Sequence, residues 1–395
     1  MFLDFNLSSI PHIIFGAGRL NEIYELIPQF GNNVLYVIGR SSLKKSGKWD
    51  EIEYAMHKNS INFSEISVNG EPTPILVDES VKKFRNQKID LVVGIGGGSV
   101  IDAGKAISAM LPKMDTIKNY LEGVGNKTHD GRKIPYIAVP TTSGTGSEAT
   151  KNAVITEVGI GGFKKSLRHD NLIPNYAIID PQLVLSCPRS VSSSCGMDAF
   201  TQLLEGFVSP KANPITDELA KSGIKQMKDA IVHISSEKAS DITVRTSMAY
   251  GSLISGIVLA NAGLGVVHGF ASSIGSLFNI PHGVVCGTLL AESTKMNINR
   301  LEQLGTKGEN GLLKYAIVGV LINGRESFEN INVPFYCSIL VKTLENWTKQ
   351  LNIDRLSKYG VTTADIDNII DRTELKNNPV HLKREDMNEI LINRI

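Results

Sequence analysis

Four polar residues in the second half of the chain have the types and spacing of a metal site. Asp198 and Gln202 are one helical turn apart, and His268 and His282 follow at a spacing that suits two elements with converging ends. One carboxylate and two imidazoles bind Zn²⁺ or Fe²⁺ and leave a coordination position open. In the simpler interpretation, the histidines are hydrogen-bonded core residues. Asp198, expected in the first turn of a helix, then only complements the helix dipole.

A glycine-rich stretch in the first half has the composition of a phosphate-binding turn. Residues 91–93 are an apolar run typical of a strand buried on both faces. Four glycines follow: Gly94, Gly96, Gly97 and Gly98. Ser99 is expected to cap a helix that begins at Val100, with Asp102 in its first turn. This geometry presents unpaired N–H groups to an anion, although the spacing fits neither standard phosphate loop, so a turn without a ligand is the alternative.

A second loop of similar composition follows residues 136–139, which also predict a strand. Its hydroxyl groups are possible donors to phosphate or ribose oxygens: Thr141, Thr142, Thr145 and Ser147. Two such loops at strand ends predict a nucleotide in the crevice of an open parallel sheet.

The elements that must position these residues change in type near residue 183. Before it, predicted strands alternate with predicted helices: strands 34–38, 61–68, 91–93, 136–139, 152–155 and 177–179, and helices 49–58 and 78–87. After it, helical periodicity dominates, over residues 198–207, 217–234, 241–261, 269–278, 337–351 and 363–373. We therefore expect an α/β domain with a doubly wound parallel sheet over residues 1–183 and an all-helical domain over residues 184–395.

Composition argues against several kinds of partner. The 41 basic and 40 acidic residues nearly cancel, which gives no electrostatic reason to expect nucleic acid or a membrane surface. No uninterrupted apolar run approaches the ~18 residues of a membrane helix. The opening residues lack a basic region and include Asp4, unlike a signal peptide. The four cysteines have neither paired nor metal-ligand spacing. We expect a cytoplasmic protein with reduced, buried cysteines.

Taken together, four motifs resemble the iron-containing (group III) alcohol dehydrogenase family. They are Gly96-Gly97-Gly98-Ser99-x-x-Asp102-x-x-Lys105, Pro140-Thr141-Thr142-Ser143-Gly144-Thr145-Gly146-Ser147-Glu148, Gly196-Met197-Asp198-Ala199 and Pro281-His282-Gly283. The resemblance covers the chain from end to end. It implies a dehydroquinate synthase-like architecture and a homodimer. It also implies reversible hydride transfer between NAD(P)(H) and a small alcohol or aldehyde, with a divalent metal that polarises the substrate oxygen.

The resemblance also implies roles for single residues. Asp198, His268 and His282 would bind the metal and act in catalysis, and Gln202 occupies the position of a fourth ligand. The implied dinucleotide contacts are Gly97, Gly98, Ser99 and Asp102 for the pyrophosphate turn, Thr141, Thr142 and Thr145 for the nicotinamide half, Asn152 and Lys164 for ribose or phosphate oxygens, Leu183 for the adenine, and Gly39 at the end of the strand over residues 34–38.

Three departures from the family pattern matter. Many members have histidine where this chain has Gln202, and an amide oxygen is a poorer ligand for iron. Many also have histidine at Ser272, one turn after His268, which removes a candidate proton relay. Gly39, followed by Arg40, stands where NAD-selective relatives carry an acid, which favours NADP(H).

Three alternative functions are considered. Glycerol dehydrogenases are similar and use one aspartate and two histidines, whereas the similar maleylacetate reductases can work without a metal. A metal-free reductase of the maleylacetate type is therefore one alternative. A catalytically silent nucleotide-binding protein is the second, which Gln202 and Ser272 keep open. The third is a lyase of the dehydroquinate-synthase type, against which the loop over residues 140–148 and the shortage of lysine and arginine near the site argue.

Overall fold

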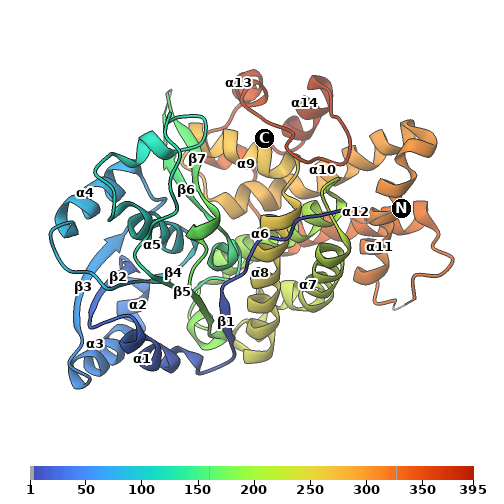
Figure 1. Cartoon of the computed structure of the whole chain (residues 1–395). Coiled ribbons are helices and arrows are strands. Elements are labelled where there is room, and N and C mark those ends of the chain that lie inside the picture. Colours follow the sequence, from blue (N-terminus) through green and yellow to red (C-terminus); the bar gives the residue numbers. More distant parts are fainter. Residues whose placement is uncertain (1–3, 160, 326) are drawn as a thin grey trace. The chain divides into compact units, whose positions relative to one another are not determined.

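The computed structural model describes residues 4–159, 161–325 and 327–395 (Figure 1). They form two compact units. The α/β unit contains residues 8–157 and 162–187, and the helical unit contains residues 188–395 together with residues 4–7, 158, 159 and 161. The chain passes between them at Cys187 and Pro188, where the sequence predicted a division at residues 183 and 184. The first three residues of the opening segment, for which no signal peptide was predicted, lie outside the described residues.

The α/β unit is built on a six-stranded parallel sheet with the strand order β1-β8-β5-β4-β2-β3. Its strands are β1 (His12–Phe15), β2 (Asn33–Gly39), β3 (Asn62–Val68), β4 (Leu91–Gly96), β5 (Tyr136–Pro140) and β8 (Tyr176–Ile179). The predicted doubly wound parallel sheet is thereby confirmed. β1 was not predicted, because four partly exposed residues at a sheet edge carry little apolar signal.

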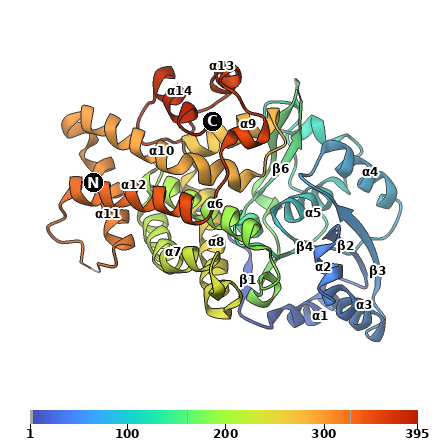
Figure 2. The ribbon, with the colours of Figure 1, turned by 180° about the vertical axis from the view of Figure 1, so that it is seen from behind.

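Helices cover both faces of this sheet (Figures 1 and 2). On one face α4 (Pro74–Phe84) and α5 (Gly98–Met110) pack in a buried cluster with alternate strand residues such as Leu35 and Val92. On the other face α1 (Ile23–Leu26), α2 (Ser42–Lys45) and α3 (Lys48–Lys58) pack with the intervening residues, such as Tyr36. Because successive side chains point to opposite faces, a strand covered on both faces is apolar throughout.

The ring of Tyr136 fills the space between β4, β5 and α5. A Cβ atom at Gly94 would overlap the tyrosine hydroxyl, and one at Gly104 would lie 2.8 Å from it. The hydroxyl also donates a hydrogen bond of 2.9 Å to the carbonyl oxygen of Ile101. Two glycines facing one tyrosine therefore set the distance between the helix and the sheet.

A two-stranded antiparallel hairpin stands apart from the main sheet. It consists of β6 (Asn152–Glu157) and β7 (Phe163–Arg168). The strand predicted at residues 152–155 therefore exists, but it does not join the parallel sheet. The strand β7 was not predicted, because its sequence Phe-Lys-Lys-Ser-Leu-Arg carries no apolar run.

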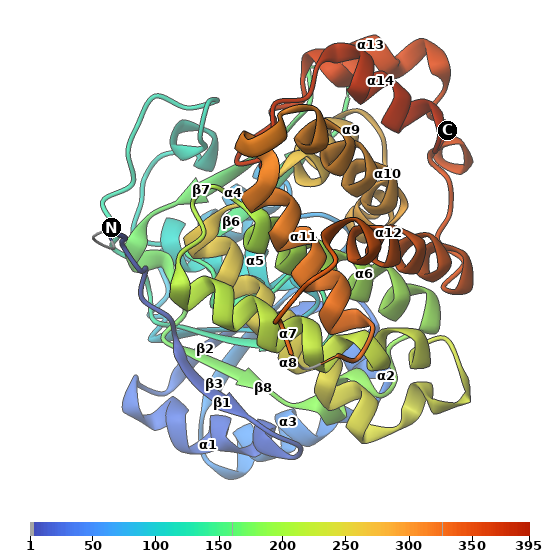
Figure 3. The same ribbon diagram turned by 90° about the vertical axis from the view of Figure 1, so that its right-hand side faces the viewer.

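The helical unit is an assembly of long packed helices. They are α6 (Arg189–Val208), α7 (Pro214–His233), α8 (Ile242–Ala262), α9 (Val266–Leu277), α10 (His282–Gln303), α11 (Glu309–Ile322), α12 (Val333–Gln350), α13 (Ile366–Asp371) and α14 (Arg384–Ile392). Helix α6 packs against α7, α8 and α10, and α7 lies beside α8 (Figure 3). By length and composition α8 is able to cross a membrane, but 67% of its most apolar window is buried inside the structure, as in an inner helix.

Several helix boundaries differ from the sequence prediction. Helix α6 begins at Arg189 and not at Asp198, because the residues between them, although rich in serine and poor in helix propensity, are largely buried against neighbouring helices. Asp198 therefore lies in the middle of a helix, and the expectation that it occupies a first turn is wrong. Helices α10, α11 and α14 were not predicted, and α4 begins at Pro74, where the side chain of Thr73 caps it.

Candidate active site

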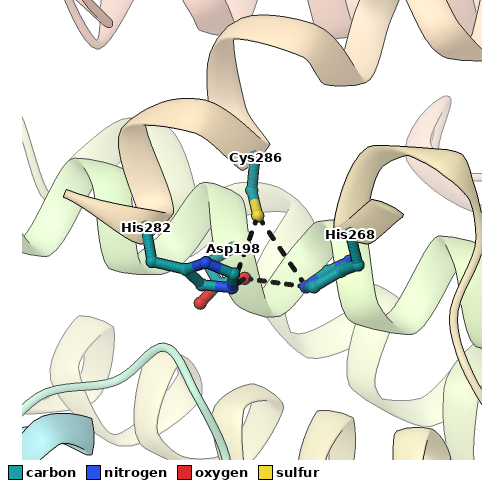
Figure 4. A group of neighbouring side chains, drawn as sticks. All are labelled: Asp198, His268, His282 and Cys286. Atoms are coloured by element: carbon teal, nitrogen blue, oxygen red, sulfur yellow. Dashed lines mark hydrogen bonds and ion pairs between the residues drawn. The ribbon is translucent and has the colours of Figure 1, made fainter. Parts of the chain in front are cut away.

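Three helices of the helical unit bring the predicted metal ligands together (Figure 4). Asp198 comes from the middle of α6, His268 from the first turn of α9, and His282 is the first residue of α10. The two histidines thus stand at the N-terminal ends of consecutive helices. The predicted convergence of two elements on one point is confirmed.

The side-chain atoms of this group form a compact cluster. Asp198 Oδ1 lies 3.2 Å from His268 Nε2 and 3.8 Å from His282 Nε2. A fourth side chain joins them, since Cys286 Sγ lies 3.7 Å from the Nε2 atom of each histidine. The four ligand atoms all lie within 4.8 Å of one another. One carboxylate, two imidazoles and a thiol at this spacing fit a divalent transition metal.

Cys286 was missed by the sequence analysis, which treated it as an ordinary buried cysteine. Its signal is the spacing His282-x-x-x-Cys286, which places both side chains on one face of α10. The signal was not used because α10 itself was not predicted.

Glu205 is a second missed residue, and it orients His268. Its Oε2 atom lies 2.7 Å from His268 Nδ1, and its Oε1 atom accepts a 2.7 Å hydrogen bond from the backbone N–H of Val267. A carboxylate at Nδ1 holds the ring proton there and leaves Nε2 free to bind a metal. Glu205 follows Asp198 by seven residues on one face of α6, a spacing that was available in the sequence.

The surroundings of His268 and Cys286 favour their protonated forms, and a bound metal would displace these protons. Burial lowers the pKa of His268, but the groups around it, Cys286, Asp198 and Glu205, raise it, and the net shift is well upward. Burial raises the pKa of the Cys286 thiol to about 12, so at neutral pH the two carboxylates carry the upward shift of His268. Burial also opposes ionisation of Asp198, yet the two imidazoles hold its pKa below the usual value.

Gln202 lies beside the cluster with its amide nitrogen toward Asp198. Its Nε2 atom donates a 3.3 Å hydrogen bond to Asp198 Oδ1, and Ser255 Oγ lies 2.7 Å from its amide oxygen. In this orientation Gln202 acts on the aspartate as a donor. Its predicted role as a metal ligand stays a prediction.

Ser272, at the predicted relay position, is tied to the backbone of α9. Its hydroxyl donates a 2.8 Å hydrogen bond to the carbonyl oxygen of His268. The amino group of Lys376 donates to the same carbonyl at 2.9 Å and to the Ser272 hydroxyl at 3.3 Å. A lysine from the C-terminal segment therefore stabilises the helix that carries one of the metal ligands.

In the α/β unit, the glycine turn leads from β4 into α5. The helix begins at Gly98, with Gly97 as its N-cap and no side-chain cap, so the expected cap by Ser99 is wrong. Extended backbone at Gly97 lets the helix begin earlier, and Ser99 lies inside the first turn. By helix geometry the N–H groups of Gly98 and Ser99 have no acceptor within the helix, which is the arrangement that binds a phosphate.

The two predicted nucleotide-binding loops contact each other. The N–H of Thr141 donates a 2.8 Å hydrogen bond to the carbonyl oxygen of Gly96. A Cβ atom at Gly97 would lie 3.3 Å from Thr142, and one at Gly98 would lie 2.7 Å from Thr145 Oγ1. The threonine loop therefore packs against the glycine turn, and only glycine permits this approach at Gly98.

Gly39 lies at the point where the order of the strands reverses. From β2 the chain runs outward to β3, then returns past β2 to β4 and continues to β5. Ligands of open parallel sheets bind in the crevice at this switch point, beyond the carboxyl ends of the strands. Gly39 ends β2 there, and a Cβ atom on it would lie 3.8 Å from Val100 of α5.

A buried lysine fastens the threonine loop to α5. Lys105 is 1% exposed, and its amino group donates to Ser147 O at 2.7 Å, Thr150 Oγ1 at 3.0 Å and Asn152 O at 2.7 Å. Burial lowers the pKa of Lys105 to about 8, and burial raises the pKa of the neighbouring Glu148 carboxyl to about 7.

Asp102 contributes to the same scaffold. Its carboxylate accepts hydrogen bonds from the Ser147 hydroxyl and, at 3.1 Å, from the backbone N–H of Val154. Both oxygens of Asp102 are therefore engaged by the protein, which suits a residue that positions the loops. A direct contact of Asp102 with the cofactor stays a prediction.

The remaining predicted cofactor residues belong to the same unit. Lys164 on β7 forms an ion pair of 3.1 Å with Glu71, and the side chain of Asn152 on β6 donates to Ser166 at 3.3 Å. Leu183 lies in the buried cluster beneath the sheet, in the short 3₁₀ helix Pro181–Val184. Their contacts with a dinucleotide are predictions.

Comparison with known families accounts for both halves of the chain. The family described as "Iron-containing alcohol dehydrogenase" matches residues 11–181. The family described as "Fe-containing alcohol dehydrogenase family, C-terminal" matches residues 192–395.

Individual relatives are similar along most of their length. The NAD-dependent methanol dehydrogenase of Bacillus methanolicus is 28% identical over 335 residues, which cover 82% of this chain and 86% of that protein. The NADPH-dependent butanol dehydrogenase of Clostridium saccharobutylicum is 27% identical over 394 residues, which cover 96% of this chain and 95% of that protein.

Solved structures agree with this relationship. The crystal structure of a variant of an archaeal halo-thermophilic alcohol dehydrogenase from a Red Sea brine pool superposes with a TM-score of 0.89 at 25% identity, covering 100% of this chain and 99% of that one. With both halves matched in chain order and the fold shared, the chain belongs to the iron-containing alcohol dehydrogenase family and is an oxidoreductase acting on CH–OH groups.

Proposed function

We propose that this protein reversibly transfers hydride between NADP(H) and a small primary alcohol or its aldehyde, with Asp198, His268 and His282 as metal ligands. The observation that carries the proposal is the buried cluster of these three side chains with Cys286, whose ligand atoms all lie within 4.8 Å. Membership of the family supports the reaction class.

The helical unit supplies the electrophilic half of the reaction. A divalent metal, when bound, acts as a Lewis acid toward an alcohol or carbonyl oxygen. Asp198 lowers the net positive charge of the site, and the two imidazoles offer Nε2 lone pairs. Glu205 keeps the His268 proton on Nδ1, which leaves Nε2 directed at Asp198 and Cys286.

The α/β unit supplies the cofactor half of the reaction. A nicotinamide dinucleotide accepts or donates the hydride. The N–H groups at the start of α5 face the position of the pyrophosphate in sheets of this kind, and the hydroxyls of Thr141, Thr142 and Thr145 lie on the adjoining loop. Lys105 holds that loop in place.

The preference for NADP(H) rests on the end of β2. An acid at this position would accept hydrogen bonds from the ribose 2′-hydroxyl and repel a 2′-phosphate, and this chain has Gly39 there. The next residue, Arg40, is exposed and carries a charge that attracts phosphate. The two named relatives differ in cofactor, since one is NAD-dependent and one is NADPH-dependent. The proposed preference for NADP(H) is therefore based on Gly39 and Arg40 of this chain.

The test combines metal content with turnover. Purified protein is analysed for iron and zinc, and oxidation of NADPH by a series of short aldehydes is followed before and after chelation. We expect near-stoichiometric metal, loss of activity on chelation and recovery when the metal is restored. His268→Ala and His282→Ala should abolish turnover while dinucleotide affinity stays within about twofold, and the exposed His381→Ala serves as the matched control.

Other outcomes identify the alternatives. If either active-site variant turns over substrate at the wild-type rate, the proposed metal mechanism is contradicted. Activity that survives complete chelation would point to a metal-free reductase of the maleylacetate type. A dinucleotide that is bound but recycled without net absorbance change would indicate a lyase, and binding with no turnover of any substrate would indicate a silent protein.

Assembly and location complete the proposal. We expect a homodimer, because the segment over residues 5–10 exposes the apolar side chains of Phe5, Leu7 and Ile10. We expect a cytoplasmic protein, since the four cysteines lack the sequence spacing of a disulfide framework. Light scattering on the purified protein measures the assembly, and fractionation of cells that express it measures the location.

A further inference from the structure

Cys286 is the residue of the cluster whose presence the proposed metal triad does not require. It is fully buried, and its side chain points into the space between the two histidines (Figure 4). Its sulfur is equidistant from both Nε2 atoms, at 3.7 Å. A buried thiol that served only to fill space would not need to face three other ligand atoms at once.

The distances within the cluster match the edges of a metal coordination polyhedron. Zinc bonds of about 2.3 Å to sulfur and 2.0–2.1 Å to nitrogen or oxygen, at tetrahedral angles, separate sulfur from nitrogen by about 3.6 Å and nitrogen from oxygen by about 3.3 Å. The observed separations are 3.7 Å for both sulfur–nitrogen pairs and 3.2 and 3.8 Å for the nitrogen–oxygen pairs. All four ligand atoms lie within 4.8 Å of one another, so one ion can contact them once the side chains close in around it.

We propose that Cys286 is a direct ligand of the active-site metal and occupies the coordination position that Gln202 leaves unfilled. The proposal rests on the proposed function, because it adds a ligand to the same site. On binding, the sulfur–metal bond forms and the thiol proton leaves to solvent, so that no oxidant or reductant is needed. The donor set becomes one carboxylate, two imidazoles and one thiolate.

A thiolate changes which metal the site selects. Soft sulfur ligands favour zinc, whereas sites of nitrogen and oxygen alone also suit iron. The Asp198–His268–His282–Cys286 site should therefore prefer zinc to Fe²⁺. Four protein ligands leave a fifth position for the substrate oxygen, as in zinc sites that expand their coordination during the reaction.

Cobalt is the probe that distinguishes a sulfur ligand from an oxygen ligand. The full-length protein is stripped by chelation and loaded with Co²⁺, and its absorbance is recorded in the near ultraviolet, where thiolate-to-cobalt charge transfer appears. Bound cobalt is measured by elemental analysis. We expect the band in wild type and its absence from Cys286→Ser and Cys286→His. The His variant keeps a fourth ligand and should retain cobalt. The Ser variant should bind zinc at least about tenfold more weakly than wild type, because even the loss of a residue that only hydrogen-bonds to a metal ligand has a cost of this size.

The matched control is Cys337→Ser, a buried cysteine of the same unit whose thiol faces the carbonyl oxygen of Leu312. It should keep both the cobalt and the band. Cobalt bound to wild type without the band, or a band that persists in both Cys286 variants, would refute the ligand assignment and leave the proposed function standing. A wild-type protein that binds no metal would overturn the inference together with the metal part of the proposed function, and NADPH turnover would then be judged separately.

Discussion

Glu205 Oε2 lies 2.7 Å from His268 Nδ1, and both residues are buried. The second oxygen of the same carboxylate is bound to the N–H of Val267, the residue before the histidine. One glutamate on α6 therefore holds both the ring and the backbone at the start of α9. The imidazole cannot turn without breaking a charge-assisted hydrogen bond inside the protein.

Glu205→Gln should weaken metal binding by 10- to 100-fold, roughly the cost of losing a partner of a metal-bound histidine. The amide retains an acceptor for Nδ1–H but removes the charge that makes the imidazole a stronger ligand. Competition with a chromogenic chelator measures the change. Glu302→Gln, an exposed position on α10, is the control. Equal zinc affinity of Glu205→Gln and wild type would contradict this role.

Gly39→Asp should shift the cofactor preference toward NADH by at least about tenfold, equivalent to about 1.4 kcal/mol. The new carboxylate would accept hydrogen bonds from a 2′-hydroxyl and repel a 2′-phosphate. A Cβ atom fits at this position, because its nearest atoms at Gly39 would be Ser42 Oγ at 3.5 Å and Val100 Cγ2 at 3.8 Å. The ratio of kcat/KM for NADPH and NADH is the measurement. An unchanged ratio would place the ribose elsewhere.

Lys105→Met should destabilise the α/β unit by about 3 kcal/mol, because it removes a buried cation that donates to two carbonyl oxygens and lies 3.8 Å from Asp102 Oδ1. The carbonyl oxygens of Ser147 and Asn152 lose a charged donor at 2.7 Å and keep the longer contacts of the Thr150 hydroxyl, at 3.1 and 3.3 Å. Guanidinium unfolding and NADPH affinity should both be affected, since the threonine loop is released. Lys82→Met, exposed on α4, should behave as wild type. A midpoint for Lys105→Met equal to that of the control would show that the buried lysine is not required.

Glu148 should make stability fall as pH rises from about 4.5 to about 7. Burial raises its pKa in the folded protein to about 7 from 4.5, so within this window the folded state holds a proton that the unfolded state has released. Glu148→Gln should flatten this dependence, which amounts to at most about 1.4 kcal/mol per pH unit. Unfolding at pH 5 and pH 7 measures it.

Lys105 acts with the opposite sign in a separate window. Its folded pKa of about 8 lies below the usual 10.5, so stability should rise with pH between these values. The two windows separate the two groups. For the Glu148 prediction, the contradicting result is a Glu148→Gln protein whose stability changes between pH 5 and pH 7 as much as that of wild type.

The sequence was informative where chemistry is carried by local motifs. The glycine turn, the threonine loop and the positions Asp198, His268 and His282 were all identified from residue types and spacing. Cys286 was not, because the helix that carries it was not predicted. Glu205 was not, although it lies in the predicted helix over residues 198–207, because its partner His268 comes from another helix. His282-Gly283 after a proline resembles a turn, which hid the start of α10. The serine-rich start of α6 hid the first nine residues of that helix, 189–197.

Pairing partners were equally hard to predict. The residues of β6 have the composition of a strand, but nothing local decides between the main sheet and a hairpin with β7. That choice depends on a segment rich in lysine and arginine that carries no strand signal of its own.

The contact of Tyr136 with Gly94 and Gly104 makes three positions interdependent. Enlarging either glycine creates a clash with the ring, and shrinking the tyrosine alone opens a void between β4 and α5. Alanine at Gly94 or Gly104 should therefore be tolerated only with a smaller residue at position 136, and random single substitutions at these sites should all score as damaging. A library that varies the three codons jointly would recover functional combinations that no stepwise path of single changes reaches.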